Sequence, residues 1–407
     1  MSPTPLPDLE MRLPRRTERK GPHPGARRVA ATVFAAQGAA VAAVSTTVPA
    51  VKEHLGLSAT ATTALIVAVA LSAGVGSFAG LAAIRRRGAV AAMRGAVLTA
   101  AGALLLIGWA PEQATVTAGY LLFGLALGGI DVSANTRATA VERHYGRSIF
   151  ASFYAAWSTG GVAAALLTAG TARLGWPPSA ILTGQAALVL LLALTLRTHP
   201  LPAAPPAPAA VPETPPTALG RDLWTRLAPF GLVLLVAYVV DSTVSAWSTV
   251  YLHQTLAADL SVAPLAYAAY QVGTVTGRAC ADHLVRRTGP AAVIRAATLL
   301  TAAALAGMAA APGWPQAVLA AGCAGLGVSA LTPLCLASAG RLRPEAAEAV
   351  LARLNVFNYL GVITGGAVSG ILGSTGHFRL AYAAPAALVL VLLLTARAFA
   401  PAAPAPV

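Results

Sequence analysis

The chain has 407 residues, of which 57% are hydrophobic and only 10% are charged. A soluble domain carries about 25% charged residues, so this composition excludes an ordinary soluble protein and indicates an α-helical protein that crosses a membrane many times. The net charge of +14 does not indicate nucleic-acid binding, because cytoplasmic loops of membrane proteins collect lysine and arginine.

The first apolar stretch follows a tail rich in proline and arginine, residues 1–28, which we expect to be a disordered cytoplasmic segment. The stretch itself is long enough to span a bilayer, so it is not typical of a cleavable signal. Twelve such stretches of about 20 apolar residues predict an all-α integral membrane protein with 12 transmembrane helices. They cover residues 29–51, 60–84, 89–110, 114–135, 148–172, 177–197, 227–252, 262–285, 289–311, 314–340, 347–375 and 378–399.

Arginines gather in alternate interruptions between these stretches. If the N-terminus is cytoplasmic, all but three of the 28 lysines and arginines lie at or toward the cytoplasmic side, the exceptions being Lys52, Arg173 and Arg379. By the positive-inside rule this asymmetry predicts that both termini are cytoplasmic. The scarcity of lysine is typical of a GC-rich bacterial genome. We therefore expect a multi-pass protein of a bacterial cytoplasmic (inner) membrane.

The longest interruption, residues 198–226, is rich in proline and alanine and predicts an extended cytoplasmic linker. It separates an N-terminal six-helix bundle, residues 29–197, from a C-terminal six-helix bundle, residues 227–399, and residues 400–407 form a tail. A single shift of 201 residues places Gly76, Arg85, Arg86, Gly88, Gly124 and Gly160 on Gly277, Arg286, Arg287, Gly289, Gly325 and Gly361. This common offset predicts two parallel six-helix repeats.

Asp241 lies about halfway along the seventh apolar stretch. An ionised carboxylate at the bilayer centre costs at least about 2.5 kcal/mol on insertion scales, so Asp241 should face a wet cavity, pair with a cation or carry a proton. Ser245 and Ser248 follow it on the same helix face. We expect Asp241 to titrate in proton coupling or to contact substrate; the alternative is a buried acid bonded to neighbouring hydroxyls.

Other polar and aromatic residues inside the apolar stretches are candidates for a substrate cavity. Asp131 and Asn135 share a face of the fourth stretch, and Tyr154 and Trp157 share a face of the fifth. Packing and hydrogen bonding are the alternative roles. The full set of cavity candidates is Gln37, Asp131, Asn135, Tyr154, Trp157, Ser245, Gln271, Asn355 and Asn358.

Charged residues near the cytoplasmic ends of the helices are candidates for a gate. We expect a short charged turn after the fourth stretch, and we expect Asp282 to meet the positive N-terminus of the fifth helix near Ser148 and so to stabilise an outward-open state. The first repeat has Leu81 at the place of Asp282, which predicts an asymmetric gate. The gate candidates are Glu142, Arg143, Arg147, Arg278, Asp282 and Arg286.

The arrangement of six plus six spans with a central linker and a basic, glycine-containing turn after the second and eighth spans resembles the major facilitator superfamily. Three stretches of the chain resemble a bacterial, fucose-permease-like branch of this superfamily. The first covers residues 129–135 and continues through 142–147, the second covers 152–158, and the third covers 247–252 and is followed by Gly277, Arg278 and Asp282. This branch tends to have histidine where Tyr154 stands and an acid where Ala246 stands. The resemblance implies a single-chain secondary transporter that works by alternating access.

Drug/proton antiporters of the superfamily tend to have a proline before two glycines in helix five and an arginine within helix four. Here Gly160 and Gly161 lack that proline, and Arg137 is expected beyond the end of helix four. The resemblance therefore favours a transporter of another solute class over a multidrug exporter.

Together these patterns predict a secondary active transporter, symporter or antiporter, that moves a small organic solute, is driven by protons and acts as a monomer. We expect no cofactor, no metal and no nucleic-acid partner. No Gly-x-x-x-x-Gly-Lys-Ser/Thr, His-Glu-x-x-His or Gly-x-Ser-x-Gly pattern occurs in the sequence, so neither an ATPase nor an intramembrane enzyme is predicted. The alternatives are an exporter of a drug or natural product, and a membrane sensor that binds without transporting.

Overall fold

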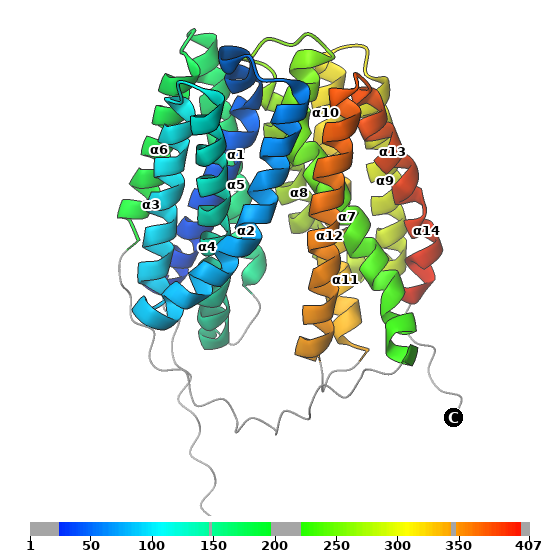
Figure 1. The fold of residues 1–407 in the computed structure, drawn as a ribbon. Coiled ribbons are helices and arrows are strands. Elements are labelled where there is room, and N and C mark those ends of the chain that lie inside the picture. The colour runs from blue at the N-terminus through cyan, green and yellow to red at the C-terminus, as the bar shows by residue number, and fades with distance from the viewer. Residues whose placement is uncertain (1–23, 146–148, 197–220, 343–346, 400–407) are drawn as a thin grey trace, which may run out of the picture.

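The computed structural model describes residues 24–145, 149–196, 221–342 and 347–399, and every regular element within these ranges is a helix (Figure 1). In chain order the helices are α1 Pro24–Leu55, α2 Ala59–Arg87, α3 Ala89–Gly108, α4 Gln113–Tyr145, α5 Phe150–Arg173, α6 Pro178–Leu194, α7 Arg221–Gln254, α8 Pro264–Thr288, α9 Pro290–Ala310, α10 Trp314–Val328, α11 Leu331–Gly340, α12 Ala347–Ser374, α13 Phe378–Leu390, α14 Leu392–Thr395 and the 3-10 helix η2 Ala396–Phe399.

These helices give the 12 membrane crossings that the apolar stretches predict. Among the described residues, ten segments are long and apolar enough to span a bilayer, counting α10 with α11 as one segment, 314–339, and α13 with α14 and η2 as another, 378–399. The remaining two crossings are α6 and α8. α6 is apolar but only 17 residues long, and α8 carries the polar residues Gln271, Thr274 and Arg278 among its apolar ones. The all-α membrane fold is therefore confirmed.

Several helices are longer than expected. α4 continues to Tyr145, so Glu142, Arg143 and His144 lie on a helix and not in a short turn, and Arg137 lies inside α4 with only 8% of its surface exposed. The cause is the absence of glycine or proline between Asn135 and Tyr145, since each intervening residue is tolerated in a helix.

The two bundles also begin earlier than the apolar stretches do. α1 begins at Pro24, where proline suits the first helical turn, so residues 24–28 are helical and not part of a disordered tail. α7 begins at Arg221, inside the expected linker. The rest of the expected tail and linker, residues 1–23 and 198–220, lies outside the described residues, as do Arg197 and the C-terminal residues 400–407.

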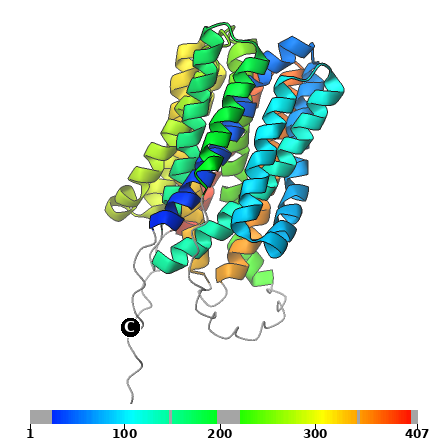
Figure 2. The same cartoon turned by 90° about the vertical axis from the view of Figure 1, so that its left-hand side faces the viewer.

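Each bundle has its own hydrophobic core, and the helix axes of both bundles are roughly aligned, with consecutive crossings running in opposite directions (Figure 2). Phe123 and Phe153 lie in the core formed mainly by α1–α6, and Leu305 and Tyr382 lie in the core formed mainly by α7–η2. Tyr267 on α8 is an exception, because it is fully buried and packs with the core of the N-terminal bundle. The bundles are thus separate packing units that meet along a limited surface.

The internal repeat is visible in backbone geometry at the predicted offset of 201 residues. Gly88 and Gly289 end α2 and α8 with φ values of 82° and 81°, a region that favours glycine. A Cβ atom at Gly76 would lie 2.1 Å from the carbonyl oxygen of Leu125, and one at Gly277 would lie 2.4 Å from that of Leu326. The same close helix approach therefore occurs in both halves.

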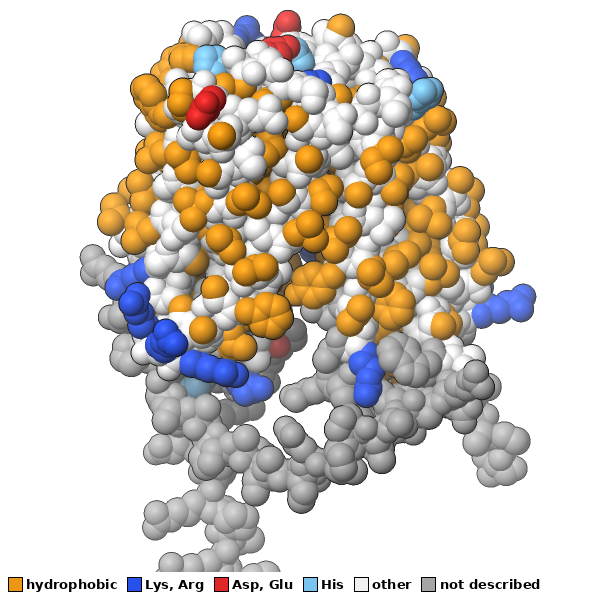
Figure 3. Space-filling model, viewed as in Figure 1, with side chains coloured by type: hydrophobic (Ala, Val, Ile, Leu, Met, Phe, Trp, Pro, Cys, Tyr) orange, Lys and Arg blue, Asp and Glu red, His pale blue; other side chains and the backbone are white. Residues whose placement is uncertain are grey.

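The two bundles meet at one end of the molecule and separate at the other. At the closed end, where α1 and α7 finish, Glu53 and His253 form an ion pair with a 2.6 Å contact, and Thr63 on α2 donates to the Gly370 carbonyl of α12 at 3.1 Å. At the open end, where α4 and α11 finish, a space-filling view shows a hollow between the bundles (Figure 3). Lysine and arginine side chains gather near this open end (Figure 3).

Candidate functional site

The bundles touch near mid-depth, where α5 and α8 cross. The Ser158 hydroxyl donates to Oε1 of Gln271 at 3.0 Å and lies 3.3 Å from the Thr274 hydroxyl, while Gly161 faces the ring of Tyr267. Gln271 is only 1% exposed. Gln271, one of the predicted cavity residues, therefore lies in the contact between the bundles.

One turn closer to the open end, Arg278 of α8 reaches across to the N-terminal bundle. Its guanidinium carbon lies 5.6 Å from the centroid of the Tyr154 ring, within the range of a cation–π interaction. Arg278 is half-buried, and its buried Nη1 has no hydrogen-bond partner among the described residues. Tyr154 is 39% exposed. The pair thus presents a cation with spare donor capacity beside an accessible ring.

In the N-terminal bundle, Asp131 of α4 is the acceptor of a small amide network. Its Oδ1 accepts from Nε2 of Gln37 at 3.3 Å and from Nδ2 of Asn135 at 3.2 Å. Asp131 is half-buried and Gln37 is 6% exposed. The sequence singled out these three residues separately or in pairs, and the structure brings them together.

In the C-terminal bundle, Asp241 of α7 accepts a 2.7 Å hydrogen bond from the phenol of Tyr270 on α8. Ser245, one turn further along α7, is half-buried, and its buried hydroxyl has no hydrogen-bond partner among the described residues. Sequence reasoning missed Tyr270, which packs in the core of the C-terminal bundle.

These residues form one group that we call the central polar cluster. Tyr154 interacts electrostatically with Asp131, Arg278 and Tyr359. Arg278 in turn lies within electrostatic range of Asp241. The cluster consists of Gln37, Asp131, Asn135, Tyr154, Tyr238, Asp241, Tyr270, Arg278 and Tyr359. It combines two carboxylates, one guanidinium, two amides and four phenols from both bundles.

Three further cavity candidates are Trp157, Asn355 and Asn358. Trp157 is half-buried, and its ring packs against the core of the N-terminal bundle. Asn358 is half-buried on α12, while the side chain of Asn355 lies outside the described residues. Trp247 is 2% exposed and donates to the Gly366 carbonyl at 3.0 Å, which is a packing role.

Glu142 occupies the N-terminus of α5. Its Oε2 accepts 2.8 Å hydrogen bonds from the backbone amides of Ile149 and Phe150, so a carboxylate of α4 caps the helix end where Asp282 was expected. Arg143 and Arg286 are exposed. The expected gate contact of Asp282 with the Arg147 region falls on side chains outside the described residues.

The described part of the chain contains no group of three or more histidine, cysteine, aspartate or glutamate residues that could hold a metal ion.

A family model described as Major Facilitator Superfamily matches residues 29–311 and 230–407, which together span both bundles. The chain belongs to the major facilitator superfamily. An MFS-type transporter of Yersinia pestis is 25% identical over 372 residues, 90% of this chain and 93% of the relative. The membrane protein MosC of Rhizobium meliloti is 26% identical over 271 residues, 66% of this chain and 64% of the relative.

Solved structures of superfamily members share the fold. A variant of the nucleoside transporter NupG aligns over 92% of this chain and 99% of its own length, with a TM-score of 0.69 and 16% identity. The Escherichia coli fucose:proton symporter FucP aligns over 91% of this chain and 97% of its own length, with a TM-score of 0.59 and 15% identity. The predicted membership of the superfamily is therefore confirmed, and the chain is an MFS transporter.

Proposed function

We propose that this MFS transporter moves a small polar organic solute across a bacterial cytoplasmic membrane as a monomer, driven by protons and without a cofactor. The observation that carries the proposal is the central polar cluster, which draws side chains from both bundles where they approach each other. A midplane site between two repeats is the arrangement that alternating access requires. No enzymatic step is part of this proposal.

Charge supports an orientation for the molecule. Arg85, Arg86 and Arg87 end α2, and Arg286 and Arg287 end α8, all at the open end. The positive-inside rule assigns this end to the cytoplasm, which also places both termini there. The structure would then represent a state that is open to the cytoplasm and closed to the outside.

A second, oppositely closed state would bring α2 and α12 together at the open end. Phe78 on α2 is 78% exposed and Val75 is 61% exposed, while Tyr359 and Val356 on α12 are 57% and 56% exposed. The two helices already touch near the closed end through Thr63 and Gly370. Rocking the bundles about the central contact would bring these exposed side chains together and close the open end.

The chemistry of the cluster favours a neutral or acceptor-rich solute with several hydroxyl groups. Gln37 and Asn135 supply amides, and Arg278 supplies a guanidinium whose Nη1 lacks a hydrogen-bond partner in the described chain. The structurally similar NupG and FucP are named for nucleosides and for fucose with protons, and both kinds of solute carry several hydroxyl groups. In this proposal Asp241 binds the coupling proton and Arg278 contacts the solute.

The test is flux in proteoliposomes with an imposed pH gradient. A panel of sugars, nucleosides and hydroxylated natural products is first screened for thermal stabilisation of the purified protein, because a ligand that binds the folded state raises apparent stability. Asp241→Asn should abolish proton-driven flux of the stabilising compound while Glu112→Gln, an exposed acid outside the cluster, retains it. Full pH-dependent flux in Asp241→Asn contradicts the coupling role, and binding without any flux supports the sensor alternative.

An exporter is a second candidate because of one position. Arg137 lies inside α4 and is 8% exposed, contrary to the expectation that it follows the helix, and an arginine within helix four is one of the two features compared above with the drug/proton antiporters. Loss of proton-driven export in Arg137→Gln, with import unaffected, would favour this candidate over uptake.

A further inference from the structure

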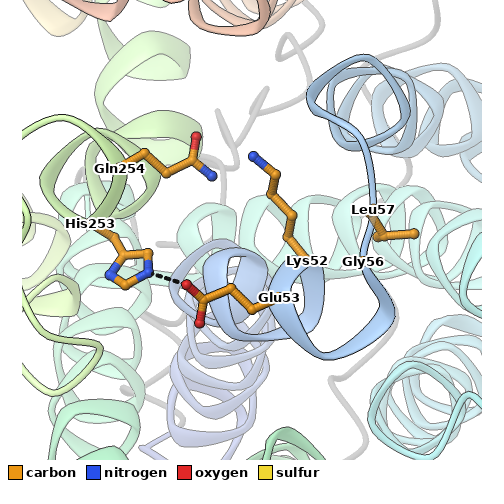
Figure 4. Close-up of a pocket in the computed structure, with 6 residues that line it drawn as sticks. All are labelled: Lys52, Glu53, Gly56, Leu57, His253 and Gln254. Carbon is orange, nitrogen blue, oxygen red and sulfur yellow. Dashed lines mark hydrogen bonds and ion pairs between the residues drawn. The ribbon is translucent and has the colours of Figure 1, made fainter.

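At the closed end, one ion pair joins the two bundles. His253 in the last turn of α7 points toward Glu53 in the last turn of α1, and Nε2 lies 2.6 Å from Oε1 (Figure 4). The pair lies in a pocket of about 540 Å³ that is also lined by Lys52, Gly56, Leu57 and Gln254. The His253 side chain is 20% exposed and that of Glu53 is 56% exposed, so both are in reach of the medium at this end.

The second ring nitrogen of His253 determines how many protons the pair holds. Nδ1 lies 2.8 Å from the carbonyl oxygen of Ala258, which can only accept, so Nδ1 carries a hydrogen. A neutral imidazole with its hydrogen on Nδ1 presents a lone pair at Nε2, which would face the lone pairs of an ionised Glu53. The 2.6 Å contact therefore requires one further proton, shared between Nε2 and Oε1.

The other charged groups near the Glu53–His253 pair do not supply a positive charge between the two side chains in place of this proton. Lys52 lines the same pocket and lies within electrostatic range of Glu53, but it lies on the same helix as Glu53 and does not link the bundles. Arg379 on α13 donates to the Ala309 carbonyl at 2.7 Å. The remaining charged or titratable side chains on segments near this end are His54, Glu112, Arg173, Asp259 and His377.

We propose that Glu53 and His253 form a proton-binding site that links the two bundles and is filled from the compartment that the closed end faces. The site exists only when the ends of α1 and α7 are adjacent, so binding of the proton and closure of this end favour each other. Acidification of that compartment would then favour the state seen here. This site is separate from Asp241 and does not depend on the identity of the solute.

The test measures the separation of the bundles at the closed end as a function of pH. In a cysteine-free background, with Cys280, Cys323 and Cys335 replaced, spin labels at Glu112→Cys and Gln316→Cys report this separation by double electron–electron resonance in nanodiscs. Between about pH 8 and about pH 5.5, the range in which histidine titrates, the closed-to-open ratio should rise roughly 1.5- to 5-fold, as expected for a partly exposed ion pair.

Two variants and a matched control decide the result. His253→Gln keeps a donor toward Glu53 but does not titrate, and Glu53→Gln removes the carboxylate, so both should lose the pH response. His54→Gln, the neighbouring exposed histidine of α1, should keep it. A normal response in His253→Gln, or loss of the response in His54→Gln alone, would overturn the proposal. Because no solute is added, failure here is distinguishable from failure of the proposed transport.

Discussion

Tyr270 donates a 2.7 Å hydrogen bond to Oδ1 of Asp241, and both side chains belong to the C-terminal bundle. Because α7 and α8 are in the same packing unit, this bond can persist when the bundles rock against each other. Arg278, in contrast, is held on α8 but contacts Tyr154 of the other bundle. Closure and opening should therefore change the surroundings of Arg278 more than those of the Tyr270 phenol.

Removing the Tyr270 hydroxyl should impair proton-driven flux. A hydrogen bond to a charged group contributes about 1.5–3 kcal/mol, so we expect Tyr270→Phe to lower the flux about tenfold or more. Tyr382→Phe is the matched control, because that buried hydroxyl has no hydrogen-bond partner in the described chain. Equal flux in both variants would contradict a role for the Tyr270 bond.

Asp131 should tolerate asparagine better than alanine. Both donors, Gln37 and Asn135, reach the same oxygen, and asparagine keeps an oxygen there. Alanine would leave the buried amide of Gln37 without its acceptor, at a cost of about 1–3 kcal/mol in the free energy of unfolding. Denaturant titration in detergent measures both variants. An equal loss of stability in Asp131→Asn and Asp131→Ala would show that charge, and not the amide network, matters.

The two repeated glycines should respond alike to alanine. A Cβ atom at Gly76 or at Gly277 would lie 2.1 or 2.4 Å from a backbone carbonyl oxygen, which forces the helices apart. Overpacking of this kind costs about 1–3 kcal/mol. Gly95→Ala on α3 is the control, since a Cβ atom there meets nothing within 4 Å and alanine is the better helix former. Thermal unfolding measures all three variants. A lower melting temperature for Gly95→Ala than for Gly76→Ala and Gly277→Ala would disprove this packing argument.

Arg278 should contribute to affinity through its planar guanidinium. Lysine keeps the charge but not the flat donor array that lies over Tyr154, and methionine keeps only the apolar stem. For a solute found by thermal stabilisation, we expect affinity to fall about tenfold or more in Arg278→Met, with Arg278→Lys between it and the parent. Arg295→Met, an exposed position on α9, should bind normally. If Arg278→Met bound the solute as tightly as the parent protein does, a contact between Arg278 and the solute would be excluded.

The sequence was sufficient for the architecture because the signals are local or repeated. Runs of apolar residues predict the crossings, and Gly76 with Gly277 marks the same close helix approach in both halves. Helix ends were less predictable: nothing between Asn135 and Tyr145 stops α4, and charge alone suggested a turn there.

The pairings within the site could not be read from one sequence. Gln37 meets Asp131 across 94 residues, and Tyr270 meets Asp241 across 29, so neither contact leaves a periodic pattern. Polarity in an apolar helix correctly marked Gln37, Asp131 and Asp241 as residues to examine. It did not mark Tyr270, because a tyrosine in a membrane helix has many ordinary packing roles.

The two separate cores have a consequence for biosynthesis. The N-terminal half can bury most of its apolar side chains while the ribosome is still making the second half, because its core draws almost entirely on α1–α6. Tyr267 and Ala268 are the exceptions, since both belong to α8, and Tyr267 lies opposite Gly161. Until α8 is inserted, the buried hydroxyl of Ser158 lacks its partners Gln271 and Thr274, so the first half reaches its final polar contacts only after the second half has begun to insert.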